Sequence, residues 1–252
     1  MKKTKTNNNP PSQAITLKNL PKPSPLHTKR AHIENLKDLR KLTKSSPRSL
    51  TTLGFPEIFR NIDSKDQRKG TKQIISLIKA QKSLSKLVLL FENSQTKQNL
   101  NLLTSNLKHS NHLTSVLFGF QTIAEVTAKI FHNLSLSISQ YKSLKSLTLA
   151  SSSSCRGIND FVVHNFLVRL KRLHSLDDLN LDFSMCLQIT DQTFQTLAKS
   201  LCSHSYKNNS LQSFTLTLYS NPSITDQTTQ ALHSIFQKLH KLQELRLNLS
   251  FL

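Results

Sequence analysis

One eight-residue pattern recurs six times in the chain, and it constrains the fold more than any other feature of the sequence. The pattern is LxxLxLxh, in which h is an apolar residue. The copies begin at Leu84, Leu113, Leu144, Leu176, Leu211 and Leu242, and only Ser151 fails the last apolar position. A spacing of roughly 30 residues is typical of a repeat that contains a strand and a helix.

Each copy predicts a strand, and three copies are followed by a predicted helix start. The apolar positions 4, 6 and 8 alternate, as in a strand that is buried on one face. Ile-(Thr/Asn)-Asp follows at Ile158, Ile189 and Ile224, where the polar side chains can accept hydrogen bonds from first-turn N–H groups. A single unit cannot bury both its strand and its helix, so we expect the units to stack.

The strand pattern with a downstream Ile-Thr-Asp resembles leucine-rich-repeat proteins of the ribonuclease-inhibitor or cysteine-containing type over residues 84–252. The resemblance implies an α/β solenoid of about six repeats, with a curved parallel sheet on the concave side and helices on the convex side. It also implies a non-catalytic binding scaffold. The chain departs from the family after the third leucine, where the usual Asn or Cys is replaced by Ser152, Ser184 and Tyr219.

The first third of the chain has a different composition. Residues 1–30 contain no acidic residue and five of the eight prolines, which predicts a disordered basic tail. Residues 31–83 are predicted to form a helical N-terminal cap or linker, with helices around Leu36–Leu42 and Thr71–Ala80. Within it, residues 53–62 predict a capped turn that enters a short helix, and they also have a faint likeness to the start of an F-box.

Positions 3, 5 and 7 of each strand should line the concave surface. This surface begins with apolar residues (Val88, Leu90, Leu117), which we expect the N-terminal helices to cover, and it ends in an acidic row. The candidate partner-binding residues are Asp178, Asn180, Asp182, Ser213, Thr215, Thr217, Glu244 and Arg246. They predict a site for a polar or basic protein segment, and an ordinary solvated sheet face is the alternative.

The net charge of +20 suggests a second kind of partner. Residues 1–80 carry 18 Lys/Arg and 5 Asp/Glu, so most of the excess is N-terminal. The alternative hypothesis is therefore a nucleic-acid- or ribonucleoprotein-associated subunit. Its phosphate contacts would be Lys2, Lys3, Lys5, Lys18, Lys22, Lys29 and Arg30. An F-box-like ubiquitin-ligase adaptor is a third hypothesis.

Motifs for catalysis, metal binding or membrane insertion are not found in the sequence, which has no CxxC, HExxH or GxSxG. We therefore predict no catalytic residue, no metal, no cofactor and no membrane partner. The default location is cytoplasmic, with nuclear or mitochondrial targeting left open. The last predicted strand is followed only by Ser250–Leu252, so its open edge predicts a homodimer or another docked partner, unless the sequence is truncated.

Overall fold

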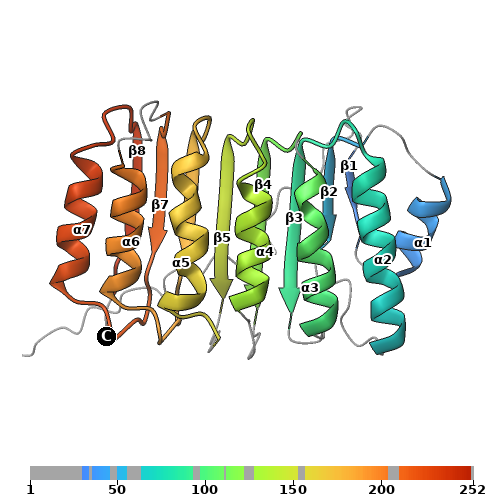
Figure 1. The fold of residues 1–252 in the computed structure, drawn as a ribbon, viewed down its shortest axis with the longest axis horizontal. Coiled ribbons are helices and arrows are strands. Elements are labelled where there is room, and N and C mark those ends of the chain that lie inside the picture. The colour runs from blue at the N-terminus through green and yellow to red at the C-terminus, as the bar shows by residue number, and fades with distance from the viewer. Residues whose placement is uncertain are drawn as a thin grey trace, which may run out of the picture.

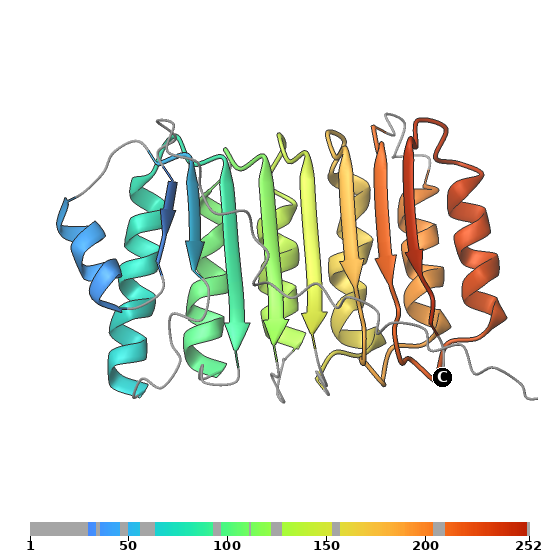
Figure 2. The same cartoon turned by 180° about the vertical axis from the view of Figure 1, so that it is seen from behind.

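The protein is an α/β solenoid in which stacked strand–helix units form one parallel sheet with helices on one of its faces. The computed structural model describes residues 30–33, 36–45, 50–55, 64–92, 97–110, 112–121, 128–152, 157–203 and 210–250. These residues form one parallel sheet in which the strands follow their order in the sequence (Figure 2). The strands are β1 (Arg30–His32), β2 (Thr52–Phe55), β3 (Lys86–Glu92), β4 (Ser115–Gln121), β5 (Ser146–Ser152), β6 (Asp178–Asp182), β7 (Ser213–Thr217) and β8 (Glu244–Asn248). The six strands predicted from the repeat are β3 to β8.

The helices form a single layer on one face of the sheet (Figure 1). They are α1 (Leu36–Ser45), α2 (Ser64–Ala80), α3 (Lys97–Asn106), α4 (Ala128–Ile138), α5 (Asp160–Arg169), α6 (Asp191–Leu201) and α7 (Asp226–Phe236). The three predicted helix starts are confirmed, because Asn159, Thr190 and Thr225 are the N-cap residues of α5, α6 and α7. Each of these side chains accepts a hydrogen bond from a first-turn N–H.

The core lies between the two layers and is built by the strand register. Leu149, Leu181 and Leu216 are neighbours on successive strands, and each is at most 1% exposed. Burying one such side chain stabilises the fold by about 1.5–3 kcal/mol. Ser151, the exception in the repeat, is also buried, and its hydroxyl donates to the carbonyl of Asp182 at 2.9 Å. Its polarity is therefore satisfied within the core.

Polar contacts join the starts of α5, α6 and α7, and we call them the aspartate clamps. The carboxylate of Asp160 accepts from the N–H of Thr190 at 3.0 Å and from its hydroxyl at 2.7 Å. One unit later, Asp191 accepts from the N–H and hydroxyl groups of both Thr225 and Thr228. Burial acts to raise the pKa of Asp191, but these hydrogen bonds outweigh it and hold the pKa below its ordinary value.

The region before the first predicted strand differs from its prediction. Residues 31–83 contain the expected helices α1 and α2, but they also contribute to β1 and β2, so the sheet begins at Arg30. Residues 53–55 belong to β2 and pair with Leu87–Leu89 of β3, where a turn into a short helix was predicted. That prediction is wrong for these three residues, because backbone pairing with β1 and β3 decides their conformation.

Two further expectations concern the N-terminal part of the chain. The prediction that N-terminal helices cover Val88 and Leu90 is wrong, because α1 and α2 lie in the helix layer on the other side of the sheet (Figures 1 and 2). The remainder of the F-box-like segment, residues 56–62, lies outside the described residues. So do residues 1–29, which include the six tail lysines proposed as phosphate contacts.

Candidate functional site

The candidate site lies on the sheet face that is turned away from the helices, which we call the open face (Figure 2). The register of β6, β7 and β8 brings the eight predicted partner-binding residues together in three rows. These rows are Asp178–Ser213–Glu244, Asn180–Thr215–Arg246 and Asp182–Thr217 with Asn248. Neighbouring strands lie about 4.8 Å apart, and Asp178 and Asp182 are about 13 Å apart along their strand.

The open face of β6 to β8 carries a net negative charge. The guanidinium of Arg246 lies 2.5 Å from a carboxylate oxygen of Glu244, so these two charges offset each other. Ser213 also donates to Glu244, at 3.2 Å, and Ser146 of β5 donates to Asp178 at 2.8 Å. The remaining negative charge therefore comes from Asp178 and Asp182 of β6.

Two polar side chains of β6 are not fully satisfied by hydrogen bonds within the described part of the protein. Burial raises the pKa of Asp182, although its carboxylate accepts hydrogen bonds from the N–H and the hydroxyl of Ser184. The side-chain oxygen of Asn180 is buried and has no hydrogen-bond partner among the described residues. An unsatisfied buried acceptor costs about 1–3 kcal/mol. The carboxylate of Asp182 would gain from a cation supplied by a bound molecule.

An apolar rim, which the sequence analysis missed, adjoins this acidic strand. It consists of Leu187, Tyr219 and Met185, which are 57%, 37% and 36% exposed. The N–H of Met185 donates to the carbonyl of Tyr219 at 2.8 Å, which joins the loops after β6 and β7. The sequence did contain a signal for this rim, namely apolar residues in loops that were predicted to be polar. Exposed apolar residues that lie close together often mark a contact surface.

The N-terminal part of the open face is different in character. Val88 and Leu90 are 6% and 4% exposed. A Cβ at Gly119 would lie 2.6 Å from the Cδ2 of Leu90, so the missing side chain of this glycine lets Leu90 lean over β4. The polar part of the open face therefore lies toward the C-terminal strands, with hydroxyl side chains from β5 onward and acidic side chains on β6 and β8.

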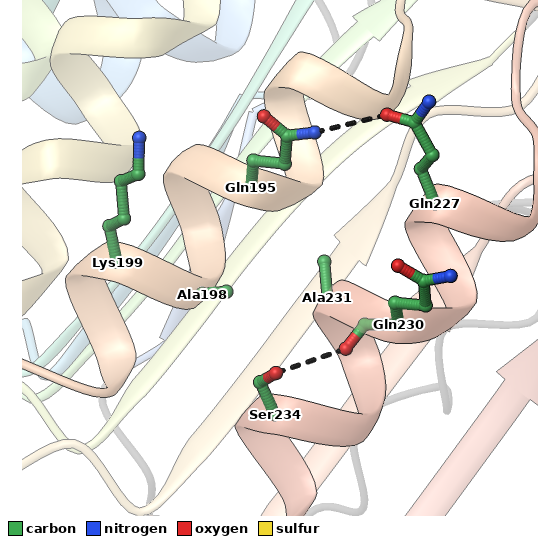
Figure 3. A pocket seen from close by; sticks show the side chains of 7 residues that line it. All are labelled: Gln195, Ala198, Lys199, Gln227, Gln230, Ala231 and Ser234. Carbon is green, nitrogen blue, oxygen red and sulfur yellow. Dashed lines mark hydrogen bonds between the residues drawn. The ribbon is translucent and has the colours of Figure 1, made fainter.

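A shallow depression of about 580 Å³ lies in the helix layer between α6 and α7 (Figure 3). Its lining residues are Gln195, Ala198, Lys199, Gln227, Gln230, Ala231 and Ser234. The amides of Gln195 and Gln227 hydrogen-bond across it at 3.3 Å. The lining contains no carboxylate, histidine or cysteine, and its one ionisable side chain is that of Lys199.

Outside the open face and this depression, the described part of the chain shows no second cluster of reactive or metal-binding side chains. Cys202 is half-buried at the end of α6, and its thiol donates to the carbonyl of Ser234 at 3.4 Å. No group of three or more His, Cys, Asp or Glu residues in the described ranges is placed to hold a metal ion. None of the helices within those ranges is both long enough and apolar enough to cross a bilayer.

Comparisons with known proteins return structural likeness without sequence relatives. No family model and no curated protein matches the chain. The C-terminal domain of tropomodulin from Caenorhabditis elegans is similar, with a TM-score of 0.47 and 14% identity over 68% of this chain and 92% of that one. A Bacteroides fragilis protein has a TM-score of 0.36 and 13% identity over 84% and 70%. At these scores, the functional argument depends on this chain's own residues.

Proposed function

We propose that this protein is a non-catalytic interaction scaffold that holds a basic segment of a partner protein against the open face of β6 to β8. The observation that carries the proposal is the strand β6, whose Asp178, Asn180 and Asp182 lie between hydroxyl-bearing strands. A lysine or arginine of the partner would place a positive charge beside the carboxylates of Asp178 and Asp182. Charge-assisted hydrogen bonds of this kind are stronger than neutral ones.

The apolar rim supports a partner segment with mixed chemistry. Asp182 is the last residue of β6, and Met185 and Leu187 follow within five residues. A segment that places a cation on Asp182 would therefore reach the rim with an apolar side chain one or two residues away. Interfaces commonly combine an apolar anchor with flanking polar contacts.

The test is a selection from a random peptide display library with the full chain. We expect the selected peptides to contain Lys or Arg beside an aromatic or aliphatic residue. Fluorescence anisotropy should then show affinity reduced by about 10-fold or more in a variant that carries Asp178→Asn and Asp182→Asn, because two charge contacts are removed.

The matched control is a variant with Asp66→Asn and Asp226→Asn, which also removes two aspartate charges but from the helix layer and outside the aspartate clamps. It should bind the peptides as tightly as the wild type, provided that circular dichroism shows a folded protein. Selection of acidic peptides, or equal loss of affinity in both variants, would contradict the proposal.

We propose a second contact, self-association of two copies through β8. Its core-facing Leu245 and Leu247 are 44% and 39% exposed, whereas their neighbours on β7, Phe214 and Leu216, are fully buried. Within the described residues β8 pairs on one side only. Such an edge with exposed leucines favours pairing with another strand.

The charges near this edge favour a second copy in antiparallel orientation. Asp226 lies at the start of α7, and Lys238 and Lys241 follow its end. A two-fold axis would place the acidic end of one α7 beside the basic end of the other.

Light scattering at about 100 μM should give a dimer, corresponding to a Kd in the micromolar range. A variant with Leu245→Glu and Leu247→Glu should be a monomer. A monomeric wild type, or a dimer that survives the two substitutions, would contradict this contact.

A further inference from the structure

The first two helices of the solenoid carry a concentration of positive charge that the proposed scaffold function does not use. Together α1 and α2 contain nine Lys/Arg and two Asp. The three helices α5, α6 and α7 contain two Lys/Arg and three Asp. The charge excess is therefore local to one end of the helix layer rather than a property of every repeat.

The cations of α2 share one exposed side of the helix. Lys65, Arg68, Lys69 and Lys72 are all exposed, and their spacing of three and four residues places them on neighbouring turns. They span about 11 Å along the helix axis, at 1.5 Å per residue. The apolar residues of α2 point the other way, because Ile74 and Ile78 are buried in the core.

Helix α1 extends this surface, since Lys37, Arg40 and Lys41 are also exposed. Arg40 lies 3.6 Å from Asp66 of α2, and about half of each side chain is exposed. A surface ion pair of this kind contributes little to stability, but it shows that the two basic helices form one continuous surface. Figure 1 places α1 and α2 side by side at the N-terminal end of the helix layer.

The side chains around these helices favour a nucleic acid over a lipid surface. Helices that bind a membrane interface expose large apolar side chains beside their cations. The exposed large apolar side chains of the described residues all lie at or after Phe161, far along the solenoid from α1 and α2. The phosphate backbone of a nucleic acid is a polyanion with closely spaced charges, and it can bind cations without the insertion of apolar side chains.

We propose that α1 and α2 form a surface that binds the phosphate backbone of nucleic acids without reading their sequence. The lysines and arginines of α2 make the central contacts, and those of α1 extend them. This surface is separate from the open face of β6 to β8, so either proposal stands or fails without the other. The proposed nucleic-acid contact lies on folded helices, whereas the hypothesis from the sequence placed it on the N-terminal tail.

The test is fluorescence anisotropy of the full chain with a duplex DNA at several salt concentrations. A variant with Lys65→Gln, Arg68→Gln, Lys69→Gln and Lys72→Gln should bind at least about 10-fold more weakly at low salt, because phosphate contacts are lost. Each lost contact should reduce the slope of log affinity against log salt by about 0.9. We therefore expect the slope to fall in magnitude by about 2–4.

Two control variants remove the same charge elsewhere. One carries Gln at Lys129, Lys142, Lys199 and Lys238, which are exposed on or beside the later helices. The other carries Gln at the tail residues Lys2, Lys3, Lys5 and Lys18. Both should retain affinity within about twofold, because they leave the α1–α2 contacts intact.

Four results would overturn the proposal. The first is an equal loss of DNA affinity in all three variants, which would mean that binding depends on net charge alone. The second is loss confined to the tail variant. The third is binding to polyglutamate or to anionic vesicles that is as tight as binding to DNA. A wild-type chain that binds no DNA at low salt overturns it as well.

Discussion

The two ends of this solenoid share one backbone architecture but are held together differently. In the N-terminal half, the units are joined by aromatic rings: Phe91, Phe120 and Phe131 stack with ring centroids 5.0 and 5.2 Å apart. In the C-terminal half, the units are joined by the aspartate clamps at the starts of α5, α6 and α7. The first half is stabilised by apolar packing, and the second adds charged hydrogen bonds.

The surfaces differ along the same division. The N-terminal half has basic helices and an apolar open face, whereas the C-terminal half has nearly neutral helices and an acidic open face. A solenoid repeat constrains its core positions and leaves its outward positions free to vary. One stack of repeats can therefore present two chemically different surfaces.

The largest expected effect is on the aromatic packing. Phe120→Ala should destabilise the protein by about 3–5 kcal/mol, because it leaves a cavity among stacked rings. Urea unfolding followed by circular dichroism measures the change. Phe161→Ala, which removes a 74% exposed ring, should cost less than about 0.5 kcal/mol. Equal effects of the two substitutions would show that the ring stack does not hold the N-terminal half together.

A smaller effect is expected when a clamp is removed. Asp191→Ala should cost about 2–4 kcal/mol, because it leaves the buried hydroxyl of Thr228 without its acceptor. The matched substitution is Asp226→Ala at the same position of α7, where the side chain is exposed. It should cost less than about 1 kcal/mol. Urea midpoints of the two variants compare them directly, and similar losses would contradict the role of the clamps.

The clamps also predict an acid response. Because the folded pKa of Asp191 is lowered, its stabilisation is fully present above the unfolded pKa of about 3.9 and is lost as the pH falls through the folded value. The urea midpoint of the wild type should therefore drop more steeply below about pH 4 than that of Asp191→Ala. Parallel pH profiles for the two proteins would be evidence against this assignment.

The smallest expected effect concerns peptide binding at the open face. A cation binds the ionised form of Asp182, whose folded pKa is raised by burial. Affinity for a basic peptide should therefore increase as the pH rises through that pKa. In Asp182→Asn this pH dependence should shrink, while Asp178→Asn should retain it. Anisotropy titrations between about pH 4 and pH 8 provide the measurement.

The repeat predicts the strands β3 to β8 and three helix starts because each unit places its leucines at fixed positions. It does not predict β1 and β2. In β2, Leu50, Leu53 and Phe55 occupy the first three apolar positions of the pattern, but Phe55 replaces the third leucine and Glu57 stands at the last apolar position. The sequence analysis treats Asp160 and Asp191 only as helix-start residues. Their contacts with the next unit depend on threonines more than 30 positions away, although the recurrence of Thr-Asp at Thr190 and Thr225 carried a signal.

The open face shows the same limit. Its eight residues follow from the alternation of a strand, and the register places them on adjacent strands as expected. The pattern contains no information on burial within the face, so it did not distinguish Asp182 from Asp178. It also missed the apolar rim, because Met185 and Tyr219 meet only when the loops after β6 and β7 are stacked.

Hydrogen–deuterium exchange of the full chain, with and without a saturating selected peptide, tests the central claim most directly. We expect slower exchange in β6 and β7 and in the loops that carry Met185 and Tyr219. We also expect unchanged exchange in α1 and α2. Protection confined to α1 and α2, or no protection of β6 and its following loop, would contradict the proposal that this acidic face is the scaffold's binding site.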